Sequence, residues 1–472
     1  MKDIEYFRNK YPQFVYRNYS WKTTEKDLHI SFDFYIKPGL KFNSKIAIKN
    51  VNQDRIQEVG EEALNNLVFN LGLIELLSYW KATCSPEILI KAGPLDEKQI
   101  IWWRDLILKG MGQFFYENKI NFNQENFLNI ISGKSGQKKT KYYRGKLKND
   151  TLVPIGGGKD SIVTLEILRK FNKNISCFSL NPTEVTKNIF KIGQVKNPII
   201  VERKIDKKLF KLNKNGFLNG HTPFSAYLAF LSLLLAAIFN KKYITFSNER
   251  SSNEGNLEYH GQIINHQYSK SFEFEKKFRR YSRKYLVKEV EYFSFSRPLY
   301  EIQISKLFSR YPKYFSYFLS CNTAFRIFSG EEKSATWCRK CPKCLFIFIS
   351  LYPFLGKEQM TKIFGENLFE KITLLPTMLA LIGETDFKPF ECVGTRKESL
   401  IAFYLSWEET IKTAKREKEL PFLLKYFENN ILKKHPKITK EAKEIMASWD
   451  KENNLPKSFE KILKRYKIKM VR

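Results

Sequence analysis

Apolar and polar residues alternate or recur at regular spacings along much of the chain, and these spacings predict its elements. Polar and apolar positions alternate over His29–Ile36, as in a β-strand with one buried face. Over Glu61–Lys81 apolar residues recur at helical spacing and predict an amphipathic helix. We expect a mixed α+β domain over residues 1–148, ending in the basic, glycine-containing segment Gly133–Lys148 as a linker.

Residues 149–350 alternate short apolar runs with helical segments. Helices are expected over Ser161–Phe171 and over the uncharged run Phe224–Phe239. Four runs have the composition of buried parallel strands: Leu152–Ile155, Ile175–Leu180, Pro198–Val201 and Tyr243–Phe246. This alternation predicts an α/β fold built on a doubly wound parallel sheet, in which ligands bind at the carboxyl ends of the strands.

Two later segments are also predicted to be helical. Phe272–Phe295 interleaves aromatic and basic residues, which superficially resembles a nucleic-acid-binding surface. However, Phe274, Phe278 and Tyr281 follow one another at helical spacing, so we interpret them as the core-facing side of an amphipathic helix. Residues 351–472 have a helical, strongly charged pattern and form the C-terminal region.

Three consecutive glycines, Gly156, Gly157 and Gly158, follow the first predicted strand and precede a helix. Without side chains, their backbone N–H groups can approach a phosphate closely, and the helix that follows adds its positive N-terminal end. The Walker A pattern does not fit, because it needs Gly at Val153 and Ser or Thr at Asp160. The alternative is an ordinary strand-to-helix turn capped by Asp160 or Ser161. We favour a phosphate site.

Polar residues follow the other predicted strands at the same edge of the sheet. Asn181 follows the second strand, and the last strand is followed by ten mostly polar residues, Ser247–Asn256. A second polar segment, Asn265–Ser271, comes shortly after. A solvated surface loop is the alternative to a binding loop. The candidate ligand-binding residues are Asn181, Ser247, Asn248, Glu249, Arg250, Asn253, Glu254, Asn256, Gln267 and Lys270.

Two of the five histidines fall near this edge. His221 precedes the apolar helix, and His266 lies in the second polar segment. Either could act as a general base with a pKa near neutrality. A single histidine is more often structural, so both interpretations stay open for each residue.

Three cysteines, Cys338, Cys341 and Cys344, have the C-x2-C-x2-C spacing of metal ligands, and Cys321 could complete a tetrahedral set. Four thiolates favour a structural Zn²⁺ without an open coordination position. A 4Fe–4S cluster is the competing interpretation, and cysteines placed on one helix by chance are the third.

The composition narrows the class of protein. A hydrophobic content of 43% and an aromatic content of 15% exclude general disorder. The 81 basic and 49 acidic residues give a formal charge of +32, but this excess is spread along the whole chain, so we do not infer nucleic-acid binding from it. No signal peptide or membrane-spanning run is evident, and we expect a cytoplasmic protein that does not insert into membranes.

The glycine segment resembles the pyrophosphate loop (PP-loop) of ATP pyrophosphatases, Ser-Gly-Gly-x-Asp-Ser, with Gly156 in place of the first Ser. The chain as a whole, from about Phe69 to Thr395, resembles the UDP-N-acetylmuramoyl-L-alanyl-L-glutamate epimerase family. This resemblance rests on the segments Gly156–Ser161, Ser247–Asn256, Asn265–Ser271, Trp337–Cys344 and Lys388–Thr395, together with Leu71–Glu75, Ser78–Lys81 and Trp102–Trp103.

The resemblance implies a PP-loop sheet of the adenine nucleotide alpha hydrolase-like type and an ATP- and Mg²⁺-dependent isomerase. Its substrate would be UDP-MurNAc-L-Ala-L-Glu, whose terminal L-Glu becomes D-Glu through an acyl-adenylate, with release of AMP and diphosphate during peptidoglycan precursor synthesis. ATP would be bound by Gly156, Gly157, Gly158, Lys159, Asp160, Ser161, Asn181, Ser247, Asn248, Glu249 and Arg250. Asp160 would hold Mg²⁺, and His266 or His221 would act on the α-proton. Asn253, Glu254, Asn256, Gln267 and Lys270 would bind the substrate.

Two other functions fit the same residues. A nucleoside- or tRNA-modifying enzyme with a PP-loop would also adenylylate its substrate, and the basic chain would suit tRNA. A degenerate ATP-binding module would sense nucleotide without catalysis, although the presence of Asp160 and Ser161 argues against degeneracy. A tRNA ligand would bind with a steep salt dependence, and a sensor would bind ATP without releasing diphosphate.

Overall fold

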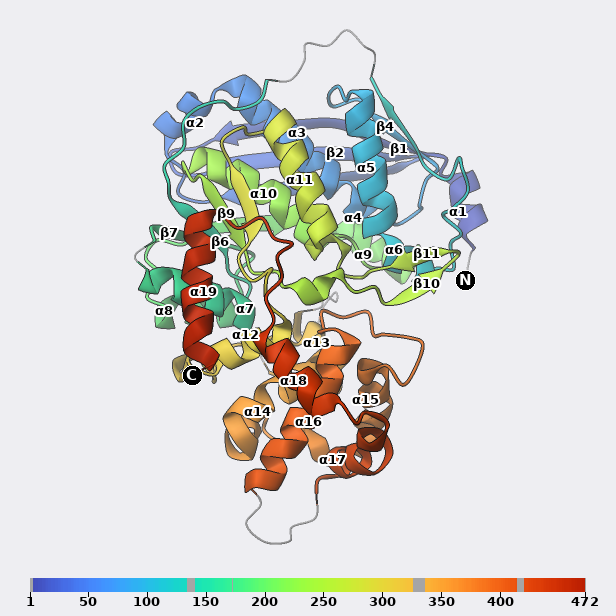
Figure 1. Cartoon of the computed structure of the whole chain (residues 1–472). Coiled ribbons are helices and arrows are strands. Elements are labelled where there is room, and N and C mark those ends of the chain that lie inside the picture. The colour runs from blue at the N-terminus through green and yellow to red at the C-terminus, as the bar shows by residue number, and fades with distance from the viewer. Residues whose placement is uncertain (1–2, 134–140, 172, 326–335, 414–419, 472) are drawn as a thin grey trace.

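The computed structural model describes residues 3–133, 141–171, 173–325, 336–413 and 420–471 (Figure 1). Residues 134–140 of the predicted linker lie outside this part of the chain. Ten of the described strands form one sheet in the order β12-β9-β6-β7-β8-β3-β2-β1-β4-β5. They are β1 (Gln13–Thr23), β2 (Leu28–Lys37), β3 (Leu40–Ile48), β4 (Glu87–Ile90), β5 (Asn129–Ser132), β6 (Thr151–Pro154), β7 (Ile175–Leu180), β8 (Ile199–Lys204), β9 (Tyr243–Phe246) and β12 (Glu291–Ser294). A separate hairpin pairs β10 (Leu257–Tyr259) with β11 (Gln262–Ile264).

One half of the sheet is parallel. Strands β8, β7, β6, β9 and β12 are neighbours in this order, and each adjacent pair is parallel. Numbered along the chain, these five strands have the order 3-2-1-4-5, so the direction of the connections reverses between β6 and β9. Ligands of doubly wound sheets bind at this switch point, beside the strand carboxyl ends.

The other half is mixed and extends the same sheet. β3 pairs antiparallel with β8, β1–β3 form an antiparallel meander, and β4 and β5 add parallel strands beyond β1. The boundary expected at residue 148 therefore falls between strands of one continuous sheet, and the division of the chain into domains stays a prediction.

Neighbouring residues of the central strands enter two different cores. Leu152 and Tyr292 join the core beneath α3, α5, α10 and α11, whereas Val153 and Phe293 join the core formed with α7, α8 and α12. Helices on both faces explain why most positions of these strands are buried, as expected for a doubly wound sheet. In β2, by contrast, buried and partly exposed residues alternate, because helices cover one face there.

The helices surround the sheet and form a C-terminal group beside it (Figure 1). The N-terminal and central helices are α1 (Ile4–Lys10), α2 (Gln53–Val59), α3 (Glu61–Glu75), α4 (Leu77–Trp80), α5 (Glu97–Gly110), α6 (Gly112–Glu117), α7 (Lys159–Lys170), α8 (Glu184–Ile192), α9 (Lys207–Lys214), α10 (Phe224–Ile238), α11 (Phe272–Tyr285) and α12 (Glu301–Phe308). The later ones are α13 (Asn322–Phe325), α14 (Pro342–Phe364), α15 (Leu375–Ile382), α16 (Arg396–Thr413), α17 (Phe422–Tyr426), α18 (Ile438–Ala447) and α19 (Lys457–Val471).

The structure confirms the α/β class, the four predicted parallel strands and the helical C-terminal region. Two predictions were incomplete. The helix expected over Glu61–Lys81 is divided into α3 and α4 at Leu76, and Phe272–Phe295 contains β12 after helix α11. The strand was missed because the helical spacing of the aromatic residues in this segment ends at Tyr285. The four residues of β12 are too few to show the alternation of a strand.

Candidate active site

The glycine loop lies at the switch point of the sheet, between the end of β6 and the start of α7. Gly157 has φ +106°, a conformation that favours glycine, and Gly158 is the N-cap of α7. A Cβ on Gly156 would meet no protein atom within 4 Å, so the loop has an open side. The amides and the helix N-terminus therefore have the composition and the room that a phosphate needs.

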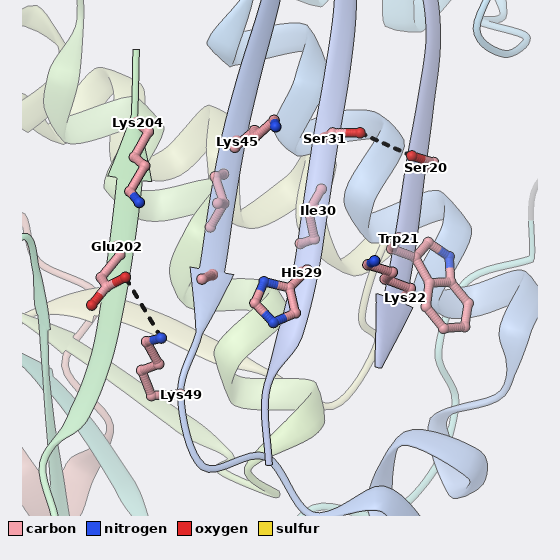
Figure 2. A pocket seen from close by; sticks show the side chains of 12 residues that line it. Ser20, Trp21, Lys22, His29, Ile30, Ser31, Lys45, Lys49, Glu202 and Lys204 are labelled. Atoms are coloured by element: carbon pink, nitrogen blue, oxygen red, sulfur yellow. Dashed lines mark hydrogen bonds and ion pairs between the residues drawn. The ribbon is translucent and has the colours of Figure 1, made fainter. Parts of the chain in front are cut away.

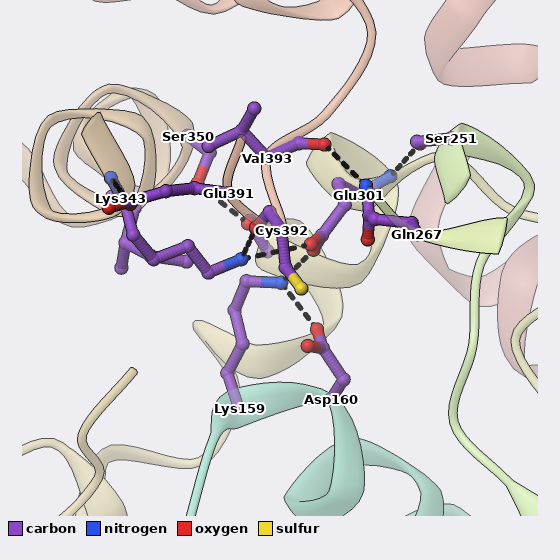
Figure 3. A network of polar contacts seen from close by, with 12 residues as sticks. Lys159, Asp160, Ser251, Gln267, Glu301, Lys343, Ser350, Glu391, Cys392 and Val393 are labelled. Carbon is purple, nitrogen blue, oxygen red and sulfur yellow. Dashed lines mark hydrogen bonds and ion pairs between the residues drawn. The ribbon is translucent and has the colours of Figure 1, made fainter. Parts of the chain in front are cut away.

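A network of buried charges lies directly behind this loop (Figure 3). The Lys159 ammonium is fully buried and forms ion pairs with Asp160 and Glu301, and Lys343 Nζ lies 3.4 Å from the other Glu301 oxygen. Burial opposes ionisation of Glu301, but Lys159 and Lys343 lower the pKa of this carboxyl to about 2. Glu301 is therefore a fixed negative charge between two cations that come from opposite ends of the predicted catalytic region.

Ionisation is disfavoured at two further carboxyl groups near the loop. Burial, and after it the charge of Glu301, raises the pKa of Asp160. The same two causes raise the pKa of Glu249 to about 8. The Asp160 side chain is 26% exposed, so it can contact a ligand. Carboxylates whose ionisation is disfavoured by burial and by each other are stabilised by a divalent cation, and this chemistry fits Mg²⁺.

The two predicted histidines lie together beside this network. The His221 and His266 ring centroids are 4.5 Å apart. Burial, followed by Lys270 and Lys343, lowers the pKa of His266 to about 3. Burial and the charges of His266 and Lys81 lower the pKa of His221 well below its usual range. Both shifts oppose the expectation of a pKa near neutrality, because the two rings are buried and lysines rather than carboxylates surround them.

Lys81 and Lys270 supply much of this positive charge. Lys81 Nζ donates to the carbonyl of Gly220, the residue before His221, at 2.9 Å. Burial and then the charge of Arg203 lower the pKa of Lys81 to about 8. Lys270 Nζ lies 3.0 Å from the Cys392 sulfur. An anionic substrate group is therefore well matched to this corner of the site.

Several residues predicted to bind substrate hold one chain segment, residues 388–396, against the site, and their role toward substrate stays a prediction. Asn256 accepts from the His266 N–H at 2.8 Å and donates to the Pro389 carbonyl at 2.8 Å. Gln267 Nε2 donates to the Val393 carbonyl at 3.2 Å, and Glu254 forms a 2.9 Å ion pair with Lys388. These contacts place Cys392 beside Asp160 (Figure 3).

The remaining residues of the loop after β9 have contacts within the protein. Ser247 and Thr164 hydroxyls are 2.8 Å apart, which joins this loop to α7, and Asn248 Nδ2 donates to Ser294 Oγ at 3.2 Å. Asn253 accepts from the Phe272 N–H at 2.8 Å. Arg250 packs its guanidinium over the Tyr300 ring, 4.1 Å from the centroid. Their roles toward ATP or substrate stay predictions.

A cavity of about 460 Å³ opens beside the glycine loop, at the carboxyl ends of β6, β7 and β8. Asn181 brackets the end of β8, since it donates to the Arg203 carbonyl and accepts from the Arg203 N–H. The Arg203 guanidinium is paired with Glu75 at 2.8 Å. The walls include Gly156, Phe178, Asn181, Thr186, Arg203 and Phe224. Apolar walls with a few polar groups suit a nucleoside.

A second depression, of about 550 Å³, lies on the less covered face of β1, β2, β3 and β8 (Figure 2). Lys22, Lys45, Lys49 and Lys204 surround it, and Lys49 pairs with Glu202 at 3.6 Å. None of the predicted site residues lines this depression, so we do not include it in the candidate site.

The four predicted metal ligands come together. The sulfurs of Cys321, Cys338, Cys341 and Cys344 all lie within 4.8 Å of one another, and those of Cys338 and Cys344 are 3.7 Å apart. A tetrahedral zinc–thiolate site with Zn–S bonds of about 2.3 Å has sulfur–sulfur distances of about 3.8 Å. The geometry therefore fits a structural Zn²⁺. Cys341 is the N-cap of α14, so the cluster fixes the helix end that carries Lys343.

The sequence analysis missed Glu301, Lys343 and Cys392 as site residues, and also Gln113, whose side-chain oxygen lies 2.5 Å from His266 Nδ1. Lys343 lies between two ligands of the cysteine motif, and Cys392 belongs to the segment Lys388–Thr395 that carried part of the family resemblance. Their positions within these motifs could have identified both residues as candidates for the site. Glu301 and Gln113 had no such signal in the sequence, because only the packing of α12 and α6 brings them to the site.

Comparisons with known proteins agree with the family resemblance. A family model described as the MurL N-terminal domain matches residues 6–295, and one described as the MurL C-terminal domain matches residues 317–431. The chain belongs to the MurL family. The N-terminal match begins at residue 6, so the similarity to the family begins earlier in the chain than the resemblance from about Phe69 indicated. The glycine loop and His266 fall in the N-terminal match, and the cysteine cluster and Cys392 fall in the C-terminal one.

Three curated MurL relatives carry the name UDP-N-acetyl-alpha-D-muramoyl-L-alanyl-L-glutamate epimerase. The protein from Micromonospora sp. is 35% identical over 339 residues, which cover 72% of this chain and 74% of the relative. The Salinispora tropica protein is 34% identical over 340 residues (72% and 73%), and the Xanthomonas oryzae pv. oryzae protein is 32% identical over 352 residues (72% and 75%).

Within the described ranges, every helix is too short or too polar to cross a bilayer. A cytoplasmic location stays a prediction.

Proposed function

We propose that this protein converts the terminal L-Glu of UDP-MurNAc-L-Ala-L-Glu to D-Glu in an ATP-dependent reaction that forms an acyl-adenylate and releases AMP and diphosphate. The reaction would belong to peptidoglycan precursor synthesis. The names of relatives that are 32–35% identical over 72% of the chain support the epimerisation. The open glycine loop carries the proposal of ATP dependence, because it resembles the loop of ATP pyrophosphatases and lies at the switch point, where doubly wound sheets bind nucleotides.

The glycine loop would bind the phosphates of ATP in the manner of a PP-loop. The amides of Gly156, Gly157 and Gly158 and the N-terminus of α7 offer donors to phosphate oxygens. Lys159 is buried against two carboxylates, so its charge acts from behind the loop. Mg²⁺ would be held by Asp160, and its charge would offset that of the diphosphate leaving group.

The adenosine part of ATP would occupy the cavity at the ends of β6, β7 and β8. Gly156 belongs both to the loop and to this cavity, so one nucleotide can reach both places. Asn181 lies at its rim with a left-handed backbone (φ +48°), held by Arg203. The acyl group of the substrate would then lie on the other side of the loop, where Asp160 and Cys392 are found (Figure 3).

Adenylylation explains how such a site makes an α-carbon acidic. The α-proton of a carboxylate is barely acidic, because its removal places a second negative charge beside the first. Esterification with AMP removes the first charge, and the electron pair left by the proton can enter the acyl carbonyl. Reprotonation on the opposite face and hydrolysis of the adenylate then give the D-isomer.

The cationic corner around His266 and His221 would carry out the proton transfers. The Lys270 and Lys81 ammonium groups stabilise the negative charge that develops when the α-proton leaves. His266 and His221 remain neutral near pH 7, because their pKa values are lowered by burial and by these lysines. Zn²⁺ at the four cysteines would have a structural role only.

The experiment that tests this function measures diphosphate release from ATP and Mg²⁺ with UDP-MurNAc-L-Ala-L-Glu, followed by chiral analysis of the glutamate in the product. We expect stoichiometric diphosphate and D-Glu, both requiring ATP. The matched control is UDP-MurNAc-L-Ala, which lacks the glutamate and should release no diphosphate. D-Glu formed without ATP would refute the acyl-adenylate, and diphosphate release stimulated by tRNA would favour a tRNA-modifying enzyme instead.

A further inference from the structure

Cys392 is a thiol at the site that the proposed function does not use. Cys84 and Cys177 are buried in the cores, and four other cysteines form the metal cluster, whereas Cys392 is partly exposed. Its sulfur points toward Asp160 (Figure 3). The place where adenylylation of the substrate is proposed therefore also contains a group that can take up and release a proton.

The contacts of Cys392 are those of a functional thiol. Lys270 Nζ lies 3.0 Å from its sulfur, and His266 Nε2 lies 3.8 Å from it. Its carbonyl accepts from Lys343, and the neighbouring Val393 carbonyl accepts from Gln267. The sulfur is thus held between an ammonium group and an imidazole by a backbone that is fixed on both sides.

The tautomer of His266 follows from its other neighbour. Gln113 Nε2 donates to Glu117 at 2.7 Å, so Gln113 Oε1 faces His266 Nδ1, 2.5 Å away. An amide oxygen accepts, and Nδ1 must therefore carry the hydrogen. His266 Nε2 is left with a lone pair directed at the sulfur, where it can accept an S–H hydrogen bond.

The charges around the pair favour sulfur over imidazole as the base. Lys270, Lys343 and Lys388 oppose a proton on His266, whose pKa is lowered to about 3 by burial and then by these lysines. A base this weak removes an α-proton slowly. Lys270 Nζ, 3.0 Å from the sulfur, is placed to pair with it once the thiol has lost its proton. The same cationic surroundings therefore weaken the histidine and suit a sulfur base.

We propose that Cys392 Sγ is the atom that exchanges the substrate α-proton on one face of the glutamate, with His266 as its hydrogen-bond acceptor. The assignment rests on the proposed epimerisation. With 3.8 Å between sulfur and Nε2, no carbon fits between them, so the two groups serve the same face.

The step balances without an oxidant or reductant. Cys392 loses its thiol proton to water, and the thiolate takes the α-hydrogen as a proton. The electron pair of the broken C–H bond enters the acyl carbonyl, and the new S–H donates to His266 Nε2. A proton that reaches the opposite face then completes the inversion, and no bond forms between sulfur and the substrate.

The test compares the wild type with Cys392→Ala and Cys392→Ser in D₂O, with ATP, Mg²⁺ and UDP-MurNAc-L-Ala-L-Glu. We expect diphosphate release to be retained within about threefold, which shows that the variants fold and adenylylate. Deuterium incorporation at the α-carbon should fall by about 10²-fold or more, as for loss of a general base. Cys177→Ala, which removes a core thiol away from the site, is the matched control and should exchange normally.

A second readout does not depend on activity. Alkylation of Cys392 by iodoacetamide, mapped by peptide mass spectrometry, should show a pH midpoint that rises by about one unit or more in Lys270→Met, because the neighbouring cation is lost. An unchanged midpoint would show that Lys270 does not act on this sulfur and would overturn the assignment.

The possible failures are distinguishable. Wild-type exchange in Cys392→Ala would overturn the assignment while leaving the epimerase intact. An acyl group found on Cys392 after acid quenching would also overturn it, since the thiol would then be a nucleophile. Exchange that depends on Cys392 but needs no ATP would support the assignment and refute the adenylate.

Discussion

Glu301 at the start of α12 pairs with Lys159, the first residue of α7, and both side chains are buried. The second Glu301 oxygen lies 3.4 Å from Lys343 Nζ on α14. One carboxylate therefore connects the helix that follows the glycine loop with the helix that begins at the cysteine cluster. Without this carboxylate Lys343 would lose its ion pair and Lys159 would keep that with Asp160, so two buried cations would share too little negative charge.

We expect Glu301→Gln to destabilise the protein by about 3–5 kcal/mol, the usual cost of removing one partner of a buried ion pair. Urea unfolding followed by tryptophan fluorescence measures this. The matched control is Glu384→Gln, which removes a carboxylate from an exposed pair with Lys434 and should cost less than about 1 kcal/mol. Equal effects of the two substitutions would mean that the buried network contributes little.

Gly156→Ala separates phosphate binding from folding. A Cβ at this position meets no protein atom within 4 Å, so the free energy of unfolding should change by less than about 1 kcal/mol. The methyl group would nevertheless occupy the space that a phosphate needs, and we expect KM for ATP to rise about tenfold or more. Steady-state diphosphate release provides KM.

Gly133→Ala is the control for this substitution. Its Cβ would lie 3.6 Å from the Ile90 carbonyl, an ordinary contact, at the edge strand β5. It should change neither KM nor stability appreciably. An unchanged KM for ATP in Gly156→Ala would argue that no phosphate lies against the glycine loop.

His266 should remain neutral through the physiological pH range. Its folded-state pKa is lowered to about 3, whereas an unfolded histidine titrates near 6.5. With histidine labelled by ¹³C at Cε1, the His266 signal, assigned by its loss in His266→Gln, should not move between pH 5.5 and 8. The same signal in urea should titrate near pH 6.5.

The sign of the effect on stability follows from the same shift. Between about pH 3 and 6.5 the unfolded state binds a proton at this residue and the native state does not, so the free energy of unfolding falls as the pH is lowered. His266→Gln should make this fall less steep. A native His266 that titrates near neutrality would refute the electrostatic description of the site.

The elements of the fold could be predicted from the sequence where a local pattern determines them. They could not be predicted where contacts between distant segments determine them. Runs such as Tyr243–Phe246 are mostly apolar because both faces of their strands are covered, and this pattern was visible in the sequence. The continuation of the sheet from β8 into β3 did not show, because a pairing between residues about 155 positions apart has no local signal.

The site divides in the same way. The glycine loop, the polar segments and the cysteine spacing are short motifs, whereas Glu301 enters through a tertiary contact alone. The pKa values of the histidines depend on lysines from four segments of the chain, so the residue type predicted a base where the surroundings disfavour one. Asn256 and Gln267 were predicted to bind substrate, and in the structure they hold the segment that contains Cys392, a role with no signal in the sequence.

The cysteine cluster leads to a last prediction, in which loss of the bound metal lowers activity at the active site. Because Cys341 caps α14 and Lys343 follows within its first turn, loss of the metal should release the Lys343 side chain from Glu301 and from the Cys392 carbonyl. We expect one zinc per chain by elemental analysis. Cys338→Ser should lose this zinc, lower the unfolding temperature and reduce epimerisation about tenfold or more.

The control is Cys84→Ala, which removes a buried thiol outside the cluster and should retain one zinc per chain. Lys343→Met should keep the zinc as well but lose activity, since it removes the side chain and leaves its support intact. This pair separates the metal from the residue it positions: if Cys338→Ser loses zinc while epimerisation persists at the wild-type rate, the cluster does not position Lys343. Iron with absorption near 400 nm in place of zinc would instead identify an iron–sulfur cluster.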